Sequence, residues 1–152
     1  MMNILVAVDG SPLSLKAVAH VLELVAGGLR AQLVLVNVQE PATVYEMVTL
    51  HDPEALAKLA QDAGKDMLAP AVTTISRAGV PFVQAVLTGD PVPAMLEAME
   101  EHACQAIVMG SHGKGAITSA LLGSVSREML EKSPVPVTFV KPAPEPDSDD
   151  ES

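Results

Sequence analysis

The sequence predicts a doubly wound α/β fold, in which a five-stranded parallel sheet of order 3-2-1-4-5 has helices on both faces. Short apolar runs without polar alternation recur along the 152-residue chain, as in strands that are buried on both faces. Helical segments separate these runs, and such alternation favours parallel strands joined by right-handed crossovers. Hydrophobic residues make up 49% of the chain and aromatic residues only 2%, so the core must be aliphatic.

The predicted elements follow from apolar spacing and from the turn residues between them. Five apolar runs are predicted strands, at residues 4–8, 33–38, 82–87, 106–109 and 136–140. Four segments with apolar residues at helical spacing are predicted helices, at residues 12–26, 53–78, 91–103 and 124–132. The run at 82–87 alternates more than the others, which is typical of an edge strand. A loop is expected at 41–52.

Serine, proline and glycine residues mark the predicted helix ends. Ser11 is expected to cap the first helix with Pro12 in its first turn, and Gly27-Gly28 are expected to end it. Gly79 is expected to end the second helix. Pro70 lies inside that helix and should kink or split it, because proline lacks the backbone donor and clashes one turn back.

Composition indicates one domain at 1–141 and a disordered acidic tail at 142–152. The formal net charge of −10 and the absence of clustered Lys and Arg argue against nucleic-acid binding. No apolar run approaches the roughly 20 residues that a membrane helix needs. Cys104 is the only cysteine, so no intrachain disulfide can form, and the thiol is expected to be a small buried apolar group. We therefore expect a cytoplasmic protein without membrane attachment.

The most informative segment follows the fourth predicted strand. Gly110-Ser111-His112-Gly113 is separated by nine residues from Gly123-Ser124-Val125-Ser126, which opens the last predicted helix. Backbone N–H groups at a helix start are unpaired and favour an anion, most often a phosphate. Small residues let that backbone approach a ligand closely. The segment therefore predicts an anion site at the carboxyl end of the sheet, where doubly wound folds bind ligands.

Three common phosphate and hydrolase motifs do not fit this segment. A Walker A loop requires Gly five residues before Gly113 and Ser or Thr after Lys114, but Val108 and Gly115 stand there. A dinucleotide fingerprint requires Gly where Thr118 stands. The serines are also wrongly spaced for a Gly-x-Ser-x-Gly nucleophile elbow.

The remaining pattern, Gly-x-x-Gly, nine residues and Gly-Ser, together with a first strand that ends in Asp9, resembles the ATP-binding branch of the universal stress protein family. The resemblance extends to Lys141 and includes Val34 to Val38 and Pro134 to Val137. It implies that Asp9 lies beside the adenosine half, that Val38 contacts adenine, and that the glycine–serine segment follows ribose and phosphates. The implied nucleotide contacts are Ala7, Val8, Asp9, Ser11, Val38, Met109, Gly110, Ser111, His112, Gly113, Gly123, Ser124, Val125 and Ser126.

Further expectations concern the cofactor and the oligomer. ATP would come with Mg²⁺ or Mn²⁺, held mainly by the triphosphate because the sequence offers no carboxylate cage near the loop. The resemblance implies a homodimer through Val137 to Val140, and an exposed apolar edge strand invites such pairing. No catalytic or metal-ligating residue is predicted.

Simpler roles remain open for individual residues. Asp9 can be only a turn former, Ser124 only a helix cap, and Lys114 only a solvated loop residue. His112 has no partner at a spacing typical of a metal site or a catalytic dyad.

Three functions are compatible with these features. The first is a nucleotide sensor of the stress response that binds ATP. The second is an interaction module that works through its dimer face or acidic tail without nucleotide. The third is a slow ATPase, for which the sequence shows no convincing general base.

Overall fold

The computed structural model describes residues 1–41, 49, 52–113 and 121–143. Its five parallel strands form one sheet in the order β3-β2-β1-β4-β5, which confirms the predicted fold and the edge position of β3. The strands are β1 (Met2–Ala7), β2 (Ala31–Gln39), β3 (Phe82–Thr88), β4 (Ala106–Gly110) and β5 (Val137–Val140). The helices are α1 (Pro12–Ala26), α3 (Pro53–Ala78), α4 (Pro91–Glu101) and α5 (Ser124–Lys132).

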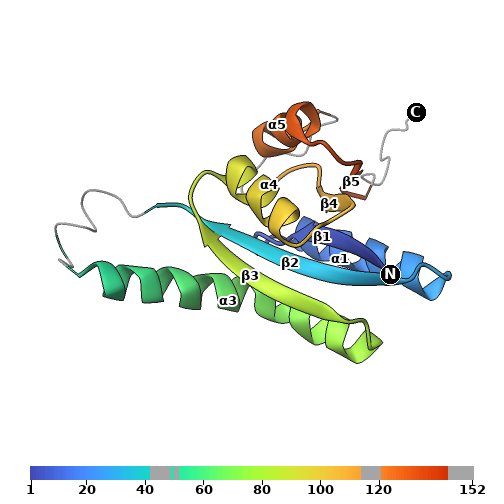
Figure 1. Ribbon diagram of the computed structural model, residues 1–152, viewed down its shortest axis with the longest axis horizontal. Helices are drawn as coiled ribbons and strands as arrows, with labels where there is room; N and C mark the ends of the chain where they lie inside the picture. Colours follow the sequence, from blue (N-terminus) through green and yellow to red (C-terminus); the bar gives the residue numbers. More distant parts are fainter. Residues whose placement is uncertain (42–48, 50–51, 114–120, 144–152) are drawn as a thin grey trace, which may run out of the picture.

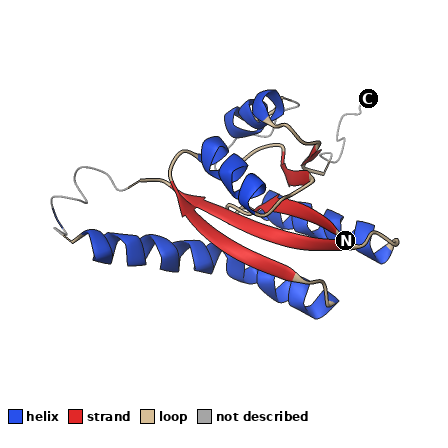
Figure 2. Ribbon diagram, viewed as in Figure 1, coloured by secondary structure: helices blue, strands red, loops and turns tan. Residues whose placement is uncertain are grey.

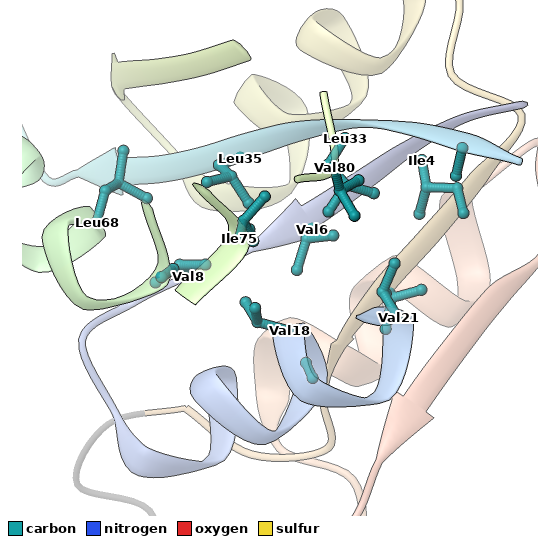
Figure 3. Packing of buried hydrophobic residues seen from close by; sticks show 14 residues of the cluster. Ile4, Val6, Val8, Val18, Val21, Leu33, Leu35, Leu68, Ile75 and Val80 are labelled. Atoms are coloured by element: carbon teal, nitrogen blue, oxygen red, sulfur yellow. The ribbon is translucent and has the colours of Figure 1, made fainter. Parts of the chain in front are cut away.

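The sheet divides the interior into two cores. Figures 1 and 2 show α4 and α5 on one side of the sheet and α1 and α3 on the other. Side chains alternate along β1, so that Val6 and Val8 pack with α1 and α3 while Leu5 packs with α4. Figure 3 shows Val6 and Val8 among side chains from β2, α1 and α3. Each of these buried aliphatic side chains stabilises the fold by about 1.5–3 kcal/mol.

The predicted helix ends at 11–12, 27 and 79 are confirmed. Ser11 Oγ accepts a hydrogen bond from Ser14 N at 3.2 Å, and Pro12 occupies the first turn of α1. Gly27 is the C-cap of α1. Gly79 ends α3 with a φ of 73°, a left-handed conformation that glycine adopts without strain. Asp52 caps α3 by accepting from Glu54 N at 3.0 Å.

Some predicted element boundaries are wrong. Helix α4 ends at Glu101 and not at 103, and β5 begins at Val137 and not at 136. Of the two outcomes predicted at Pro70, a kink or a split, the split does not occur, since α3 is one helix from Pro53 to Ala78. The first strand ends at Ala7 and does not include Val8, whose carbonyl accepts a hydrogen bond from a side chain, Asn37 Nδ2, at 2.9 Å. Most of the predicted loop at 41–52 and of the predicted tail at 142–152 lies outside the described residues.

No helix within the described part of the chain is long and apolar enough to cross a membrane.

Helix α3 approaches the sheet most closely at Gly64, which is buried. A Cβ atom there would overlap Val86 Cγ1 on β3 and would lie 3.0 Å from Asn37 Oδ1 on β2. Gly64 is therefore required by packing, although glycine weakens a helix interior by about 0.8–1 kcal/mol relative to alanine.

Gly64→Ala is predicted to lower the free energy of unfolding by about 1–3 kcal/mol, because overpacking exceeds the gain in helix propensity. Urea denaturation with a constant m-value measures this change. Val86→Ala removes the overlapping methyl groups, so the double variant should lose less than the sum of the two single losses. A Gly64→Ala protein as stable as the wild type would contradict the packing argument.

Candidate functional site

A cavity of about 140 Å³ opens at the carboxyl end of the sheet, between the ends of β2 and β4 and beside the shorter β1. Strand β1 reaches this cavity at Ala7, whereas β2 continues to Gln39. Helices α4 and α5 contribute Met95 and Val125 to its walls. The lining residues are Ala7, Val8, Asp9, Ser14, Val36, Val38, Pro91, Met95, Met109, Gly110, His112, Gly113, Val125 and Ser126. The walls are therefore largely aliphatic, with a few polar groups toward α1 and α5.

The turn after β1 holds Asp9 at the cavity. Asp9 Oδ1 accepts a hydrogen bond from Ser11 N at 2.9 Å, which closes an Asx turn directly before α1. Ser14 Oγ donates to the Ser11 carbonyl at 2.8 Å. These bonds fix the chain between β1 and α1, so the Asp9 carboxylate is anchored to the sheet end by backbone and side chain together.

Glycine is needed at positions 110 and 113, on the β4 side of the cavity, for two different structural reasons. A Cβ atom on Gly110 would lie 3.0 Å from Leu13 Cγ, so this glycine lets α1 pack against the end of β4. A Cβ atom on Gly113 would lie 3.3 Å from Asp9 Oδ2. Gly113 thus lets the loop backbone pass close to the Asp9 carboxylate, which brings the two predicted halves of the site together.

The start of α5 is organised by Gly123, which is the N-cap of the helix. Ser124 is the first residue inside the helix, so its possible role as the cap is wrong. Gly123 N donates to the Ser111 carbonyl at 2.8 Å, and Ser126 Oγ donates to the Gly110 carbonyl at 2.8 Å. Within the described part of the chain no side chain caps α5, so the first N–H groups of this helix keep their capacity to bind an anion.

Ser111 and His112 form a side-chain pair with 3.0 Å between Oγ and Nδ1. Ser111 is only 2% exposed and does not line the cavity, so its hydroxyl is not available to a substrate there. Its backbone N donates to the Val140 carbonyl at 2.9 Å, which ties the loop to the end of β5. The pair therefore supports the loop. His112 Nε2 is buried and has no hydrogen-bond partner among the described residues.

Most residues that the sequence predicted as nucleotide contacts line the cavity, and four do not. Ser11 and Ser111 are buried next to it, Gly123 caps α5, and Ser124 is exposed in the first turn of α5. Residue 114 and the loop that follows, which includes Lys114, lie outside the described residues.

Four lining residues were not predicted from the sequence, namely Ser14, Val36, Pro91 and Met95. Val36 lies two residues before Val38 on the same face of β2, so the alternation of side chains along a strand could have identified it as a lining residue. Pro91 and Met95 are four residues apart on α4, but only the tertiary packing of α4 brings them to the cavity.

The ionisable groups near the site are few. Among the described residues, no group of three or more His, Cys, Asp or Glu side chains is arranged to hold a metal ion. Asp9 is the carboxylate that lines the cavity. Cys104 lies away from the cavity in the core beside α4, where burial raises the pKa of its thiol, as expected for a small apolar group.

Comparison with known proteins agrees with this arrangement. The sequence profile of the universal stress protein family matches residues 1–141. A universal stress protein of Thermus aquaticus is 35% identical over 143 residues, which covers 91% of this chain and 98% of that protein.

Solved structures of related proteins share the fold. A protein of Methanocaldococcus jannaschii superposes with a TM-score of 0.76 and 27% identity, covering 92% of this chain and 95% of the other. A universal stress protein crystallised in complex with cAMP superposes with a TM-score of 0.63 and 26% identity, covering 91% and 95%. With the family profile and these relatives spanning nearly the whole chain, the protein belongs to the universal stress protein family.

Proposed function

We propose that this protein is an ATP-binding regulatory member of its family, acting in the stress response of the cytoplasm. The observation that supports this most strongly is the shared location of three features: an aliphatic cavity, the Asp9 carboxylate and the uncapped start of α5. Aliphatic walls accept a flat heterocycle, and unpaired helix N–H groups accept phosphate. A related protein that was crystallised with cAMP supports the choice of an adenine nucleotide.

The cavity is large enough for only part of a nucleotide. At about 140 Å³ it is smaller than the roughly 300–1,000 Å³ of typical small-molecule pockets. We infer that the base enters between Val36, Val38 and Met95, with the ribose toward Asp9 and Gly110. The phosphates then extend along Gly113 toward Gly123 and the start of α5, where a charged group stays accessible to water and to cations.

A divalent cation would accompany the triphosphate. Mg²⁺ is commonly held by one or two carboxylates together with substrate phosphates, and it keeps several waters. Asp9 can supply such a carboxylate, and the described residues form no cage of three or more ligands. The donor set therefore fits a cation that arrives with the nucleotide, and Mn²⁺ would bind in the same way.

We also propose a homodimer through β5. This strand forms one edge of the sheet, next to β4. The carbonyls of Pro136 and Val140 accept bonds from β4 and the following loop, so residues of even number in β5 direct their backbone groups toward β4. The N–H groups of Val137 and Phe139 therefore point to the free edge, where a second copy can pair with them.

Two other functions make different predictions. An interaction module would bind no nucleotide, and protein purified gently would contain no ATP or AMP by mass spectrometry. An ATPase would turn over faster than roughly 1 s⁻¹, the low end of ordinary enzymes. Positioning of the phosphates alone is compatible with slower hydrolysis.

Isothermal titration of the full chain with ATP and Mg²⁺ is predicted to give saturable binding. The expected ligand preference is ATP over inorganic triphosphate, because the aliphatic cavity adds contacts to the base. Absence of heat at about 1 mM ATP, which corresponds to a binding free energy of about −4 kcal/mol, would contradict the proposed function.

Gly113→Val and Gly123→Val are each predicted to weaken ATP binding by at least about tenfold, which is 1.4 kcal/mol. The new side chains would occupy the inferred phosphate path. A Cβ on Gly123 would make only ordinary contacts of 3.5 Å, and one on Gly113 would lie 3.3 Å from Asp9 Oδ2, which can move by a few tenths of an ångström, so the fold should survive. Gly27→Val at the end of α1 is the matched control, because it leaves the cavity unchanged. Unchanged ATP affinity in both loop variants would refute the phosphate path.

Val137→Pro is predicted to convert the dimer into a monomer. Proline removes an N–H that points to the free edge, and it is tolerated at the first residue of an edge strand. Sedimentation equilibrium measures the mass, and Thr138→Ser is the control that keeps every backbone donor. A variant that stays dimeric would exclude pairing along β5 as the interface.

A further inference from the structure

A buried polar cluster lies beside the end of β1, where β2 continues without a strand partner on that side. Asn37 on β2 is 2% exposed, and its Nδ2 donates to the Val8 carbonyl at 2.9 Å and approaches Met67 Sδ at 3.4 Å. Its Oδ1 accepts from Gln39 Nε2 at 2.7 Å. The amide lies against α3, because a Cβ atom on Gly64 would come within 3.0 Å of Oδ1. Asn37 is thus on the face of the sheet opposite to the cavity.

The hydrogen bonds on either side of Val8 show how the ladder ends. Val8 N donates to the Val36 carbonyl at 2.9 Å, as in a regular parallel pair. A continued parallel ladder would have Val38 N donating to the Val8 carbonyl. Among the described residues that backbone bond is absent, and the side chain of Asn37 occupies the carbonyl in its place.

The end of the ladder leaves the backbone groups of Val38 without a strand to pair with on the β1 side. Successive residues of a strand direct their backbone groups to opposite sides, and Val36 bonds to β1, so the N–H and C=O of Val38 also point toward β1. Beyond Ala7 no strand is there to pair with them. A donor and an acceptor are therefore left facing the gap beside the cavity that Val38 lines.

We propose that Asn37 is a positioning residue for ligand recognition, whose side-chain amide takes the place of the Val38 N–H on the Val8 carbonyl and so leaves the Val38 backbone available to a bound base. This inference rests on the proposed nucleotide function. Asn37 itself does not touch the ligand. It acts by drawing the Val8 carbonyl toward α3 and by ending the ladder one residue before Asp9.

Asparagine has the properties that this position requires. The buried amide donates to one carbonyl and accepts from Gln39, so both of its ends are bonded. Aspartate of the same shape would place an acceptor against the Val8 carbonyl, and leucine would offer no donor. In either variant the Val8 carbonyl loses its partner, and the Val38 N–H is the backbone donor that a continued parallel ladder would pair with it.

Amide hydrogen exchange by NMR tests the inference in the ligand-free protein. The Val38 N–H is predicted to exchange at least about tenfold faster than the Val36 N–H, which lies within the ladder of the same strand. In Asn37→Leu the Val38 N–H should become as protected as Val36 before any nucleotide is added. A Val38 amide as protected as Val36 in the wild type would overturn the inference, whatever the result with ATP.

Titration with ATP and Mg²⁺ tests the consequence for binding. Asn37→Leu and Asn37→Asp are predicted to weaken ATP binding by at least about tenfold, whereas Gln39→Leu keeps the Asn37–Val8 bond and should change it less than about twofold. Equal losses in Asn37 and Gln39 variants, or none, would overturn the positioning role. If the wild type binds no ATP, the proposed function fails, while the exchange rates still decide whether Asn37 ends the ladder.

Discussion

The central strand β1 is hydrogen-bonded on both sides and covered on both faces, and the rest of the molecule is arranged around this constraint. Leu5 and Val6 are fully buried in opposite cores, so neither face of the strand can present a ligand site. A cavity can form only where the backbone ladder stops. In this chain β1 ends at Ala7, and Ala7 and the two residues that follow it line the cavity.

Hydrogen bonds within the chain tie both described ends of the connection between β4 and α5 to the sheet. Ser126 and Gly123 donate to the carbonyls of Gly110 and Ser111, and Ser111 donates to β5. These bonds join the ends of β4 and β5 to the first turn of α5. The described serines of this segment thus serve as a frame, and among the described residues no side chain caps the first N–H groups of α5.

The sequence predicts the order of the elements well because their signals are local. Apolar runs, caps and terminating glycines each depend on a few neighbouring residues, and the helix bounds at 53–78 and 124–132 follow from them. The end of β1 was misplaced at Val8, where the carbonyl bonds to the side chain of Asn37, a residue distant in sequence. Splitting at Pro70 was wrong because packing of the flanking turns on the sheet holds α3 together.

The site could be predicted from the sequence only where a motif marks it. Gly110, Gly113 and Asp9 were found through spacing and position at strand ends, and they lie together at the cavity. Met95 and Pro91 belong to no such motif, since residues of these types occur in any helix that covers a sheet. Ser124 was weighed as a cap from its residue type, but the backbone turns at Gly123.

The hydrogen bonds of the site favour holding a nucleotide over converting it. Ser14 and Ser126 line the cavity, yet each hydroxyl donates to a backbone carbonyl at 2.8 Å. The pair formed by Ser111 and His112 resembles a nucleophile and base, but the Ser111 hydroxyl is buried away from the cavity. Asp9 is oriented by the Ser11 N–H. Because these groups are committed to the frame, the described residues supply fixed contacts to a ligand, as the proposed binding of a nucleotide requires.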